Sequence, residues 1–428
     1  STAYSAPRLR LAFCAFSTVS TPSENTMNIA IDIRSLMYGN LTGVGIYTYN
    51  LLKYLFEEDK SNHYFLMYNS YKDVSATLPK FPAENITWCG FQYPNKLLNT
   101  LTRTLNRPRF DKILEEYINK TPFTGGKNQK TTIDLFFTPN WLFSAFTKEV
   151  KRVMTVHDLS ILQTPEAFSF RQKLWHKNVD FKKLIWDTDI IIAVSHNTKN
   201  DLQELLHVPQ EKIHVIHEGV EKKFFQRASV EQIQKVRKKY KLPEKFMFTM
   251  SNLEPRKNIA TIIQAFVSYK NNSDDIRTNL VIAGKPGWYR GYAGKIQKLA
   301  AKTKYRHSIH FTGYIEAPDR PMIYQMAEIF LFPSCYEGFG LPVLEAMASQ
   351  TAVITSFHSS LPEIAGGAVL LVDPYNVAEI EAAITMLQTH QKIKTKLIEK
   401  SYAKAQQFAW KTAAKKTLEL FTQTQQSM

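Results

Sequence analysis

Two glutamates lie in a stretch whose residue types suit the binding of a polyhydroxylated ligand. Glu337 and Glu345 are separated by seven residues in "EGFGLPVLE", which follows the apolar run "IFLFP". That run is typical of a buried strand, and Pro342 suits the first turn of a helix. A carboxylate can accept hydrogen bonds from the vicinal hydroxyls of a ribose or a sugar. The structural alternative for Glu345 is an interaction with the helix dipole.

A serine and two cations follow another strand-like run. Ser251, Arg256 and Lys257 lie in "SNLEPRKN", between "FMFTM" and the helical stretch "IATIIQAFVSY". Two cations at this place could neutralise a diphosphate, and arginine can do so through two parallel hydrogen bonds. The alternative is a solvated basic turn, but the position at the carboxyl end of a strand favours a ligand site.

The first half of the chain contributes two further candidates. His157 directly follows the strand-like run at 152–156. A histidine at this place suits either a ligand-binding site or a structural hydrogen bond. Gly43, Val44 and Gly45 precede a helical stretch. Glycines let a ligand approach the backbone closely, and a helix N-terminus offers free N–H groups to a phosphate. A plain turn is the alternative for this glycine segment.

These candidates all follow strands in a chain that alternates strand-like and helical stretches throughout. Several of the strand-like runs are continuously apolar, as expected of parallel strands covered on both faces. The alternation predicts an α/β protein with two Rossmann-like, doubly wound domains that face each other across a cleft. The predicted strands lie within "NIAIDIR", "YFLMYN", "IDLFFTP", "RVMTVHD", "DIIIAVS", "KIHVIHEG", "FMFTMS", "NLVIAG", "SIHFTGY", "IFLFPS", "AVITS" and "AVLLVD".

The length of 428 residues exceeds what one core usually holds, so two domains are expected. We predict an extension outside the fold at 1–26, an N-terminal acceptor-binding domain at 27–218 and a C-terminal nucleotide-sugar-binding domain at 219–408. A last helix at 409–428 is expected to pack back on the first domain. The polar stretch 119–132 is expected to form a loop.

The charge and the cysteines restrict the class of protein. Lys and Arg number 54 against 38 Asp and Glu, a net charge of +16, which implies attraction to nucleic acid, an anionic membrane or a phosphorylated molecule. Cys14, Cys89 and Cys335 are scattered and show no metal-binding spacing, which favours a reducing, cytoplasmic compartment. No apolar stretch is long enough to suggest a spanning helix.

The order of the motifs resembles the family 4 retaining glycosyltransferases, which have the GT-B fold. The resemblance extends over residues 27–428 and rests on seven motifs: the GVG segment, "HDL", "PRKN", "FTGY", "EGFGLPVLE", "LPEIAGGA" and "LLVDP". The sequence is most similar to bacterial mannosyl- and rhamnosyltransferases of polysaccharide assembly.

The resemblance implies a role for each motif. Gly43–Gly45 would lie near the donor phosphates, and His157 near the reacting carbon of the donor sugar. Arg256 and Lys257 would hold the diphosphate and Glu345 the ribose. The remaining contacts to sugar, phosphate and base would come from Glu337, from the backbone of Phe339, Gly340 and Leu341, and from the strand end near Tyr314. Where many members have Gly-Arg, this chain has Ser251 and Asn252, so Arg256 must supply that cation.

The resemblance also implies the reaction. A hexose, with mannose favoured, would move from a nucleoside-diphosphate sugar to an acceptor hydroxyl with retention of the anomeric configuration. GDP-mannose is the favoured donor, and UDP-sugars remain open. No acidic D-x-D metal site is apparent, so neither a metal nor another cofactor is expected.

The acceptor and the rival functions are less closely defined. The stretches 95–120 and 170–186 mix cations with apolar residues, which fits either a membrane surface carrying a lipid-linked glycan acceptor or solvated helix faces. We therefore expect a cytoplasmic protein with peripheral contact to the inner face of the membrane. The alternatives are a sugar-nucleotide epimerase or hydrolase, and a nucleic-acid-binding protein with steeply salt-dependent binding.

Overall fold

The computed structural model describes residues 26–37, 39, 41, 43–120, 130–287, 289 and 291–426. The predicted extension, apart from Thr26, and most of the predicted loop at 119–132 lie outside these residues. The chain divides into two compact units, residues 1–154 with 418–428 and residues 155–417. The predicted domain limits at 218 and 408 stay a prediction.

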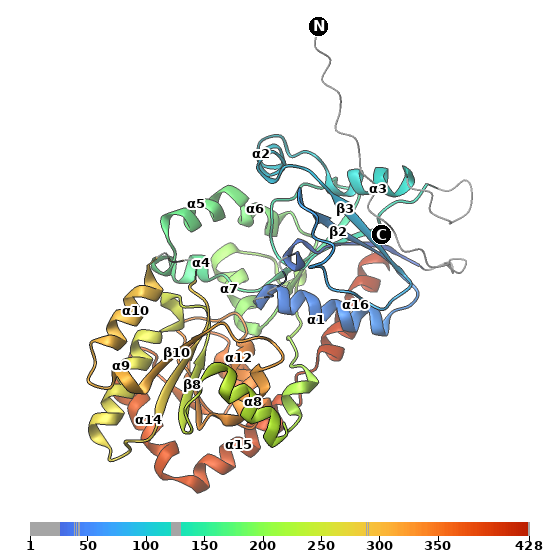
Figure 1. Cartoon of the computed structure of the whole chain (residues 1–428). Helices are drawn as coiled ribbons and strands as arrows, with labels where there is room; N and C mark the ends of the chain where they lie inside the picture. The colour runs from blue at the N-terminus through green and yellow to red at the C-terminus, as the bar shows by residue number, and fades with distance from the viewer. Residues whose placement is uncertain are drawn as a thin grey trace. The chain divides into compact units, whose positions relative to one another are not determined.

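Strands β1–β7 belong to one parallel sheet and β8–β13 to a second (Figure 1). In the first unit the strand order is β3-β2-β1-β4-β5. The elements of this part are β1 (Asn28–Asp32), η1 (Arg34–Leu36), α1 (Gly43–Glu58), β2 (His63–Asn69), β3 (Ile86–Phe91), α2 (Asn95–Leu105), α3 (Phe110–Lys120), β4 (Leu135–Thr138) and β5 (Lys151–Val156).

Every stretch predicted to be a strand contains one, and β3 is an additional strand that was not predicted. β3 pairs with β2 alone, as an edge strand, and most of its residues are only half-buried. Its sequence "ITWCGF" therefore lacks the continuous apolar character of the central strands. At the end of the chain, Phe421 of α16 (Trp410–Gln426) packs edge-on against Phe137 of β4, with ring centroids 5.3 Å apart.

The second unit begins with elements that follow β5. These are α4 (Ser160–Gln163), η2 (Pro165–Ala167), α5 (Phe170–Val179), α6 (Phe181–Trp186), β6 (Ile190–Ala193), α7 (His196–Leu206), η3 (Gln210–Lys212), β7 (Ile213–Val215) and η4 (Lys222–Phe225). Ser195 caps the N-terminus of α7, where its hydroxyl accepts a hydrogen bond from the Thr198 N–H. Such caps satisfy N–H groups that have no partner within the helix.

The rest of the second unit is built on the second sheet, with strand order β10-β9-β8-β11-β12-β13. Its elements are α8 (Val230–Tyr240), β8 (Phe246–Met250), η5 (Pro255–Lys257), α9 (Ile259–Asn272), β9 (Asn279–Ala283), α10 (Tyr292–Ala301), η6 (Arg306–Ser308), β10 (Ile309–Gly313), α11 (Arg320–Met326), β11 (Ile329–Phe332), α12 (Leu341–Ala348), β12 (Ala352–Ser356), α13 (Leu361–Ala365), β13 (Leu370–Val372), α14 (Val377–Thr389) and α15 (Gln391–Ala405).

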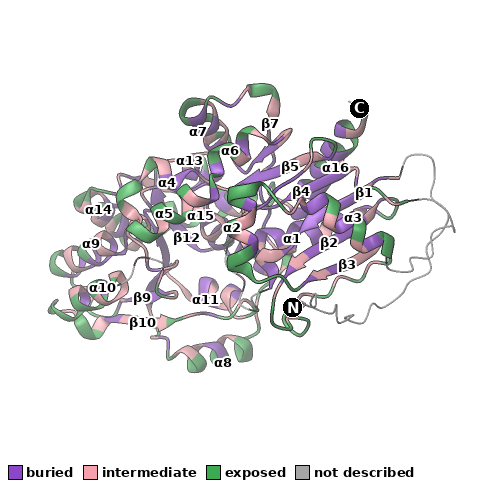
Figure 2. Ribbon diagram, turned by 90° about the horizontal axis from the view of Figure 1, so that it is seen from above, coloured by how far each residue is buried: buried purple, intermediate pink, exposed green. Residues whose placement is uncertain are grey.

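The strands of both sheets are mostly buried, whereas the helices present exposed outer faces (Figure 2). In the second unit, α9 and α14 pack on the strands through a core that includes Ile262, Phe266, Ile380 and Ile384. The core of the first unit joins β1–β4 to α2 and α3. This arrangement leaves the carboxyl ends of the parallel strands free to carry polar loops, and it confirms the predicted α/β fold.

Candidate functional site

The cationic pair and Glu337 meet because they follow neighbouring strands. β8 and β11 pair in parallel, so their carboxyl ends lie at the same edge of the sheet. The loop after β8 forms η5, which contains Arg256 and Lys257, and the loop after β11 carries Glu337. Sequence order alone separates these groups by about eighty residues, but the sheet topology brings them into contact.

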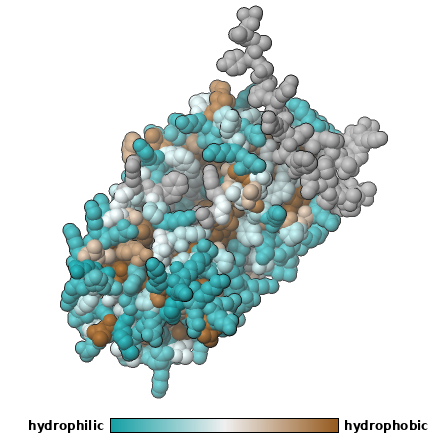
Figure 3. Space-filling view, viewed as in Figure 1, coloured by the Kyte–Doolittle hydropathy of each residue, from teal (hydrophilic) through white to brown (hydrophobic). Residues whose placement is uncertain are grey.

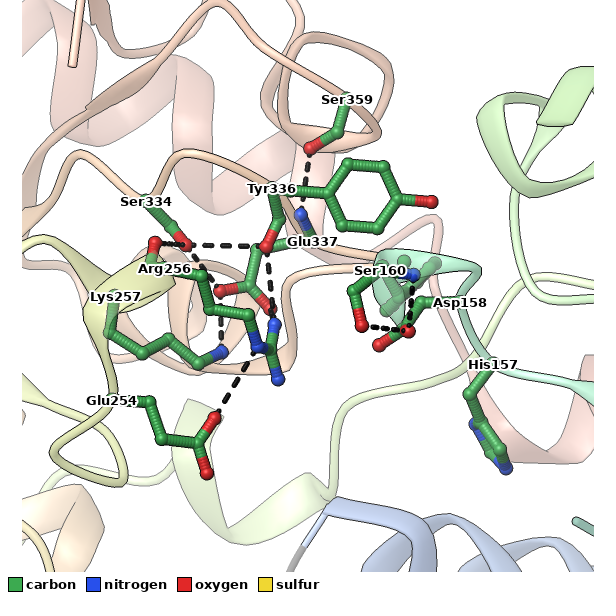
Figure 4. A network of polar contacts seen from close by, with 12 residues as sticks. His157, Asp158, Ser160, Glu254, Arg256, Lys257, Ser334, Tyr336, Glu337 and Ser359 are labelled. Atoms are coloured by element: carbon green, nitrogen blue, oxygen red, sulfur yellow. Dashed lines mark hydrogen bonds and ion pairs between the residues drawn. The ribbon is translucent and has the colours of Figure 1, made fainter. Parts of the chain in front are cut away.

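Glu337 forms ion pairs with both cations (Figure 4). The Lys257 Nζ lies 2.5 Å from one carboxylate oxygen, and the Arg256 Nη1 lies 3.3 Å from the other. Arg256 also donates to the Tyr336 carbonyl at 3.1 Å and pairs with Glu254 at 3.4 Å. The Ser334 hydroxyl donates to Glu337 at 2.7 Å, so every oxygen of this buried carboxylate is hydrogen-bonded.

Burial and charge act in opposite directions on this cluster. Burial acts to raise the pKa of Glu337, but attraction to Lys257 and Arg256 outweighs it and holds the pKa below its usual value. Burial and repulsion by Arg256 lower the pKa of Lys257, and Glu337 compensates for only part of this effect. The charge of Lys257 is therefore incompletely compensated, and an incoming anion would stabilise it.

His157 and Asp158 follow β5 and lie beside this cluster (Figure 4). The Nδ1 of His157 is 3.6 Å from a carboxylate oxygen of Glu218, which gives the ring a defined partner. Asp158 accepts hydrogen bonds from the backbone N–H and hydroxyl of Ser160. Burial acts to raise the pKa of Asp158, but attraction to Arg256 and the bonds from Ser160 lower it overall.

The loop 337–340 passes very close to the backbone after β5. A Cβ added to Gly338 would lie 1.8 Å from the His157 carbonyl oxygen, so no other residue fits there without a shift of the backbone. Gly340 has a φ of 113°, which also favours glycine. Phe339, between them, buries its ring against His217 and Phe408. Steric constraints therefore explain why both positions of the motif are glycine.

Two further predicted donor-binding residues, Ser251 and Tyr314, follow β8 and β10 of the same sheet. The Ser251 hydroxyl is buried and has no hydrogen-bond partner among the described residues, so it is available to a ligand. The Tyr314 ring follows β10 and has the Lys285 ammonium 4.0 Å from its centroid. Lys285 is an additional cation near this edge that sequence reasoning missed.

Glu345 lies within α12 and is buried. Its carboxylate accepts a hydrogen bond from the Tyr324 hydroxyl at 3.0 Å. Burial raises the pKa of Glu345, in contrast to Glu337. The two glutamates of the motif therefore have opposite electrostatic environments, since Glu337 is paired with cations and Glu345 is not.

The glycine segment belongs to the first unit, where it opens α1. A Cβ added to Gly43 would have no atom within 4 Å, whereas one added to Gly45 would lie 3.0 Å from the Leu41 side chain. Gly45 thus has a packing role, and Gly43 leaves open space beside the helix N-terminus. Nearby, Arg34 forms a bidentate pair with Asp32.

Several contacts of the site were not predicted from the sequence. Glu218 is the partner of His157, and Glu254 is a second partner of Arg256. Ser334 supports Glu337. Glu254 lies next to the recognised "PRKN" motif and could have been considered, but no sequence signal links Glu218 to His157.

A separate group of potential metal ligands includes His217, whose ring packs against Phe339. His196, His217 and Glu363 have ligand atoms within 4.8 Å of one another. The Glu363 carboxylate already accepts hydrogen bonds from the His196 and Asn197 N–H groups and lies 2.5 Å from the His217 Nε2. These contacts account for the cluster without a metal ion.

Comparisons with known proteins identify the class. The model "Glycosyltransferase Family 4" matches residues 41–224, and "Glycosyl transferases group 1" matches residues 231–404. Among solved structures, a glycosyltransferase from Rickettsia africae superimposes with a TM-score of 0.69 at 18% identity, over 94% of this chain and 99% of that one. The Anabaena protein HepE, solved with UDP and glucose, gives 0.67 at 16% identity over 92% and 99% of the two chains. The fold is therefore GT-B, as predicted.

Curated relatives add detail. O-antigen chain mannosyltransferase B of Escherichia coli is 28% identical over 89% of this chain and 96% of its own. A serotype-specific mannosyltransferase WbdA of Escherichia coli is 28% identical over 65% of this chain, which spans about a third of that longer relative (34%). The two models together cover most of the chain, so the protein belongs to the glycosyltransferases that both models describe.

Proposed function

We propose that this protein is a retaining mannosyltransferase that uses GDP-mannose, without a metal ion, to extend a glycan or lipid-linked acceptor. The observation that carries the choice of sugar is the similarity to O-antigen chain mannosyltransferase B, which extends over nearly the whole of both chains. The residues of the second unit support the chemistry, because cations and unpaired polar groups gather where the donor would bind.

In the proposed reaction the bond between the sugar and the diphosphate breaks, and negative charge grows on the leaving diphosphate. Arg256 and Lys257 stabilise that charge from fixed positions, as preorganised donors do in an oxyanion hole. The incompletely compensated charge of Lys257 favours this role. The acceptor hydroxyl attacks from the face that the diphosphate leaves, and the leaving phosphate receives the hydroxyl proton, so the anomeric configuration is retained.

His157 and Glu345 complete the proposed site. His157 lies at the carboxyl end of β5 with its Nδ1 near Glu218, which orients the ring for a contact with the sugar near its reacting carbon. Glu345 accepts from the ribose hydroxyls, and the Tyr324 hydroxyl holds its carboxylate in place. Ser251 offers its hydroxyl to the diphosphate.

Helices α5 and α6 support the proposed peripheral contact with a membrane. Phe170, Leu174 and Trp175 are exposed on α5, with Phe170 at 79%, next to several cations. A cavity of about 290 Å³ beside them is lined by apolar residues and by Lys173, Lys177 and Lys182, among others. Aromatic and cationic side chains together suit the interface of an anionic bilayer and the phosphate of a lipid-linked acceptor.

The face drawn in Figure 3 limits how such a contact could form. Its apolar side chains lie in small separate patches within a mainly hydrophilic surface. None of the helices in the described part of the chain is both long and apolar enough to cross a bilayer. We propose a cytoplasmic location at the inner membrane face, where α5 would supply a small contact.

A transfer assay tests the proposal. The purified protein is incubated with GDP-mannose and, separately, with UDP-glucose and UDP-galactose, together with mannose-containing oligosaccharide acceptors and EDTA. The proposal expects mannose transfer to an acceptor in EDTA and an α-anomer in the product by proton NMR. An inverted anomer would exclude retention. Release of free mannose or an isomer, with no glycan product under any condition, would instead favour the hydrolase or epimerase.

A further inference from the structure

Successive carbonyl groups of the loop 337–339 accept hydrogen bonds from buried serine hydroxyls. The Gly338 oxygen accepts from the Ser195 hydroxyl at 2.6 Å. The Ser360 hydroxyl lies 2.8 Å from the Phe339 oxygen and 3.0 Å from the Glu337 oxygen. Both serines have no exposed surface. These hydroxyls come from outside the loop, Ser195 from the start of α7 and Ser360 from the start of α13.

The serines determine where the next N–H groups point. A trans peptide is planar, so the carbonyl of one residue and the N–H of the next point in opposite directions. Because Ser195 holds the Gly338 carbonyl toward α7, the Phe339 N–H is directed away from that helix. Because Ser360 holds the Phe339 carbonyl toward the start of α13, the Gly340 N–H is directed away from that helix.

Those two N–H groups have no protein acceptor among the described residues. Phe339 is 4% exposed, and Gly340 is buried. Buried backbone N–H groups are nearly always hydrogen-bonded, so an orphaned pair indicates a ligand or water. Adjacent oriented N–H groups form a concavity that attracts anions.

We infer that Ser195 and Ser360 are positioning residues that aim the N–H groups of Phe339 and Gly340 at the phosphates of the donor. Neither serine touches the donor, and each acts through the peptide group that it holds. The inference rests on the proposed function, because it takes the ligand of this loop to be a nucleoside diphosphate.

The two serines differ in what else they do, which guides the choice of variants. Ser195 also caps α7 through the Thr198 N–H at 3.0 Å, so Ser195→Ala removes a cap as well. Ser360 precedes α13 but makes no side-chain cap bond, so Ser360→Ala removes only the loop contacts. Ser229 caps α8 through Gln232 at 3.2 Å and has no contact with the loop, so Ser229→Ala is a matched control for the lost cap.

The test compares the affinity for a diphosphate with that for its nucleoside. Calorimetry measures GDP, UDP and ADP and, separately, guanosine, uridine and adenosine, with the wild type, Ser195→Ala, Ser360→Ala and Ser229→Ala. For the diphosphate that the wild type binds, we expect the affinity of the two loop variants to be about tenfold weaker. This effect is smaller than that of removing a hydrogen-bond donor altogether, because the N–H groups are still present but less well oriented. Nucleoside affinity should not change, and Ser195→Thr should restore much of the loss.

The inference would be overturned if the affinities for diphosphate and nucleoside weakened equally, because a general loss of structure affects both ligands. It would also be overturned if neither affinity weakened. If the wild type binds no diphosphate, the proposed function fails, and crystal structures of the free wild type and Ser195→Ala decide the inference. The inference then expects the Gly338 carbonyl to leave its position against α7 in the variant. An unchanged peptide orientation would refute it.

Discussion

At the scale of single residues, the two glutamates of the "EGFGLPVLE" motif should respond in opposite ways to the same substitution. Glu337 neutralises Lys257 and Arg256 in a buried site, so Glu337→Gln leaves two cations poorly paired. Removal of one partner from a buried ion pair costs about 3–5 kcal/mol. We therefore expect Glu337→Gln to lower the melting temperature markedly at pH 7, measured by differential scanning calorimetry.

The pH dependence of this loss has a definite sign. The pKa of Glu337 in the folded protein lies below its ordinary value of 4.5, so the folded state binds fewer protons than the unfolded state. The stability that ionised Glu337 contributes is therefore fully present above pH 4.5. It is lost as the pH falls through the lower pKa that Glu337 has in the folded protein. The melting temperatures of wild type and Glu337→Gln should therefore approach each other below pH 4.5. A constant difference down to the acid limit would contradict the assigned ion pairs.

Glu345→Gln should stabilise the free protein. Burial raises the pKa of Glu345, so the ionised carboxylate destabilises the folded protein. Glutamine removes this charge and keeps an acceptor for the Tyr324 hydroxyl. We expect a melting temperature higher by about 2–4 °C at pH 8, which corresponds to roughly 1 kcal/mol. A group with a raised pKa contributes stability below its unfolded pKa and loses it as the pH rises, so the gap should close toward pH 4.5. The same variant should bind a nucleotide less tightly, and tighter binding would contradict the ribose role.

At the scale of elements, the glycines near the strand ends have different reasons for their presence. A Cβ at Gly338 would overlap the His157 carbonyl, whereas a Cβ at Gly43 would enter open space. Gly338→Ala should therefore displace the loop and lower both stability and activity. Gly43→Ala should fold with at least wild-type stability and lose donor affinity alone, since only a ligand needs that space. Thermal melts and donor titrations on both variants check this contrast, and a destabilised Gly43→Ala would contradict it.

Helix α5 provides a test of the membrane contact. Trp175→Glu and Phe170→Glu place a negative charge among exposed aromatic side chains. Both variants should fold, and both should bind vesicles of phosphatidylglycerol and phosphatidylethanolamine at least about tenfold more weakly than the wild type in a flotation assay. Tyr71→Glu, at an exposed aromatic residue of the first unit (76%), is the control and should bind as the wild type does. Equal binding by all variants would exclude α5 as the contact.

The elements also show what the sequence could predict. Continuous apolar runs identified the central strands, because parallel strands buried on both faces have few polar positions. The edge strand β3 lacks that pattern and was not found. The motifs predicted Arg256, Lys257 and Glu337 at one site, since each follows a strand of the same sheet. Ser195 and Ser360 could not be predicted, because a hydroxyl that holds a distant carbonyl leaves no spacing to recognise.

At the scale of the whole molecule, the chain is a GT-B glycosyltransferase whose two parallel sheets carry their polar loops at the carboxyl ends of the strands. The excess of basic residues, +16 overall, is consistent with anionic ligands. Within the second unit, Arg256 and Lys257 lie together at the carboxyl ends of β8 and β11, where both pair with Glu337. A nucleic-acid-binding protein would have no need for that arrangement.

We propose that fixed cations of the protein, rather than a metal ion, hold the diphosphate of a nucleotide sugar. The decisive experiment is isothermal titration with GDP, UDP, ADP and their common sugar conjugates, with and without EDTA. We expect one nucleoside diphosphate to bind equally well in both buffers and at least about tenfold more weakly to Lys257→Ala. Loss of binding in EDTA, or full affinity in Lys257→Ala, would contradict the claim.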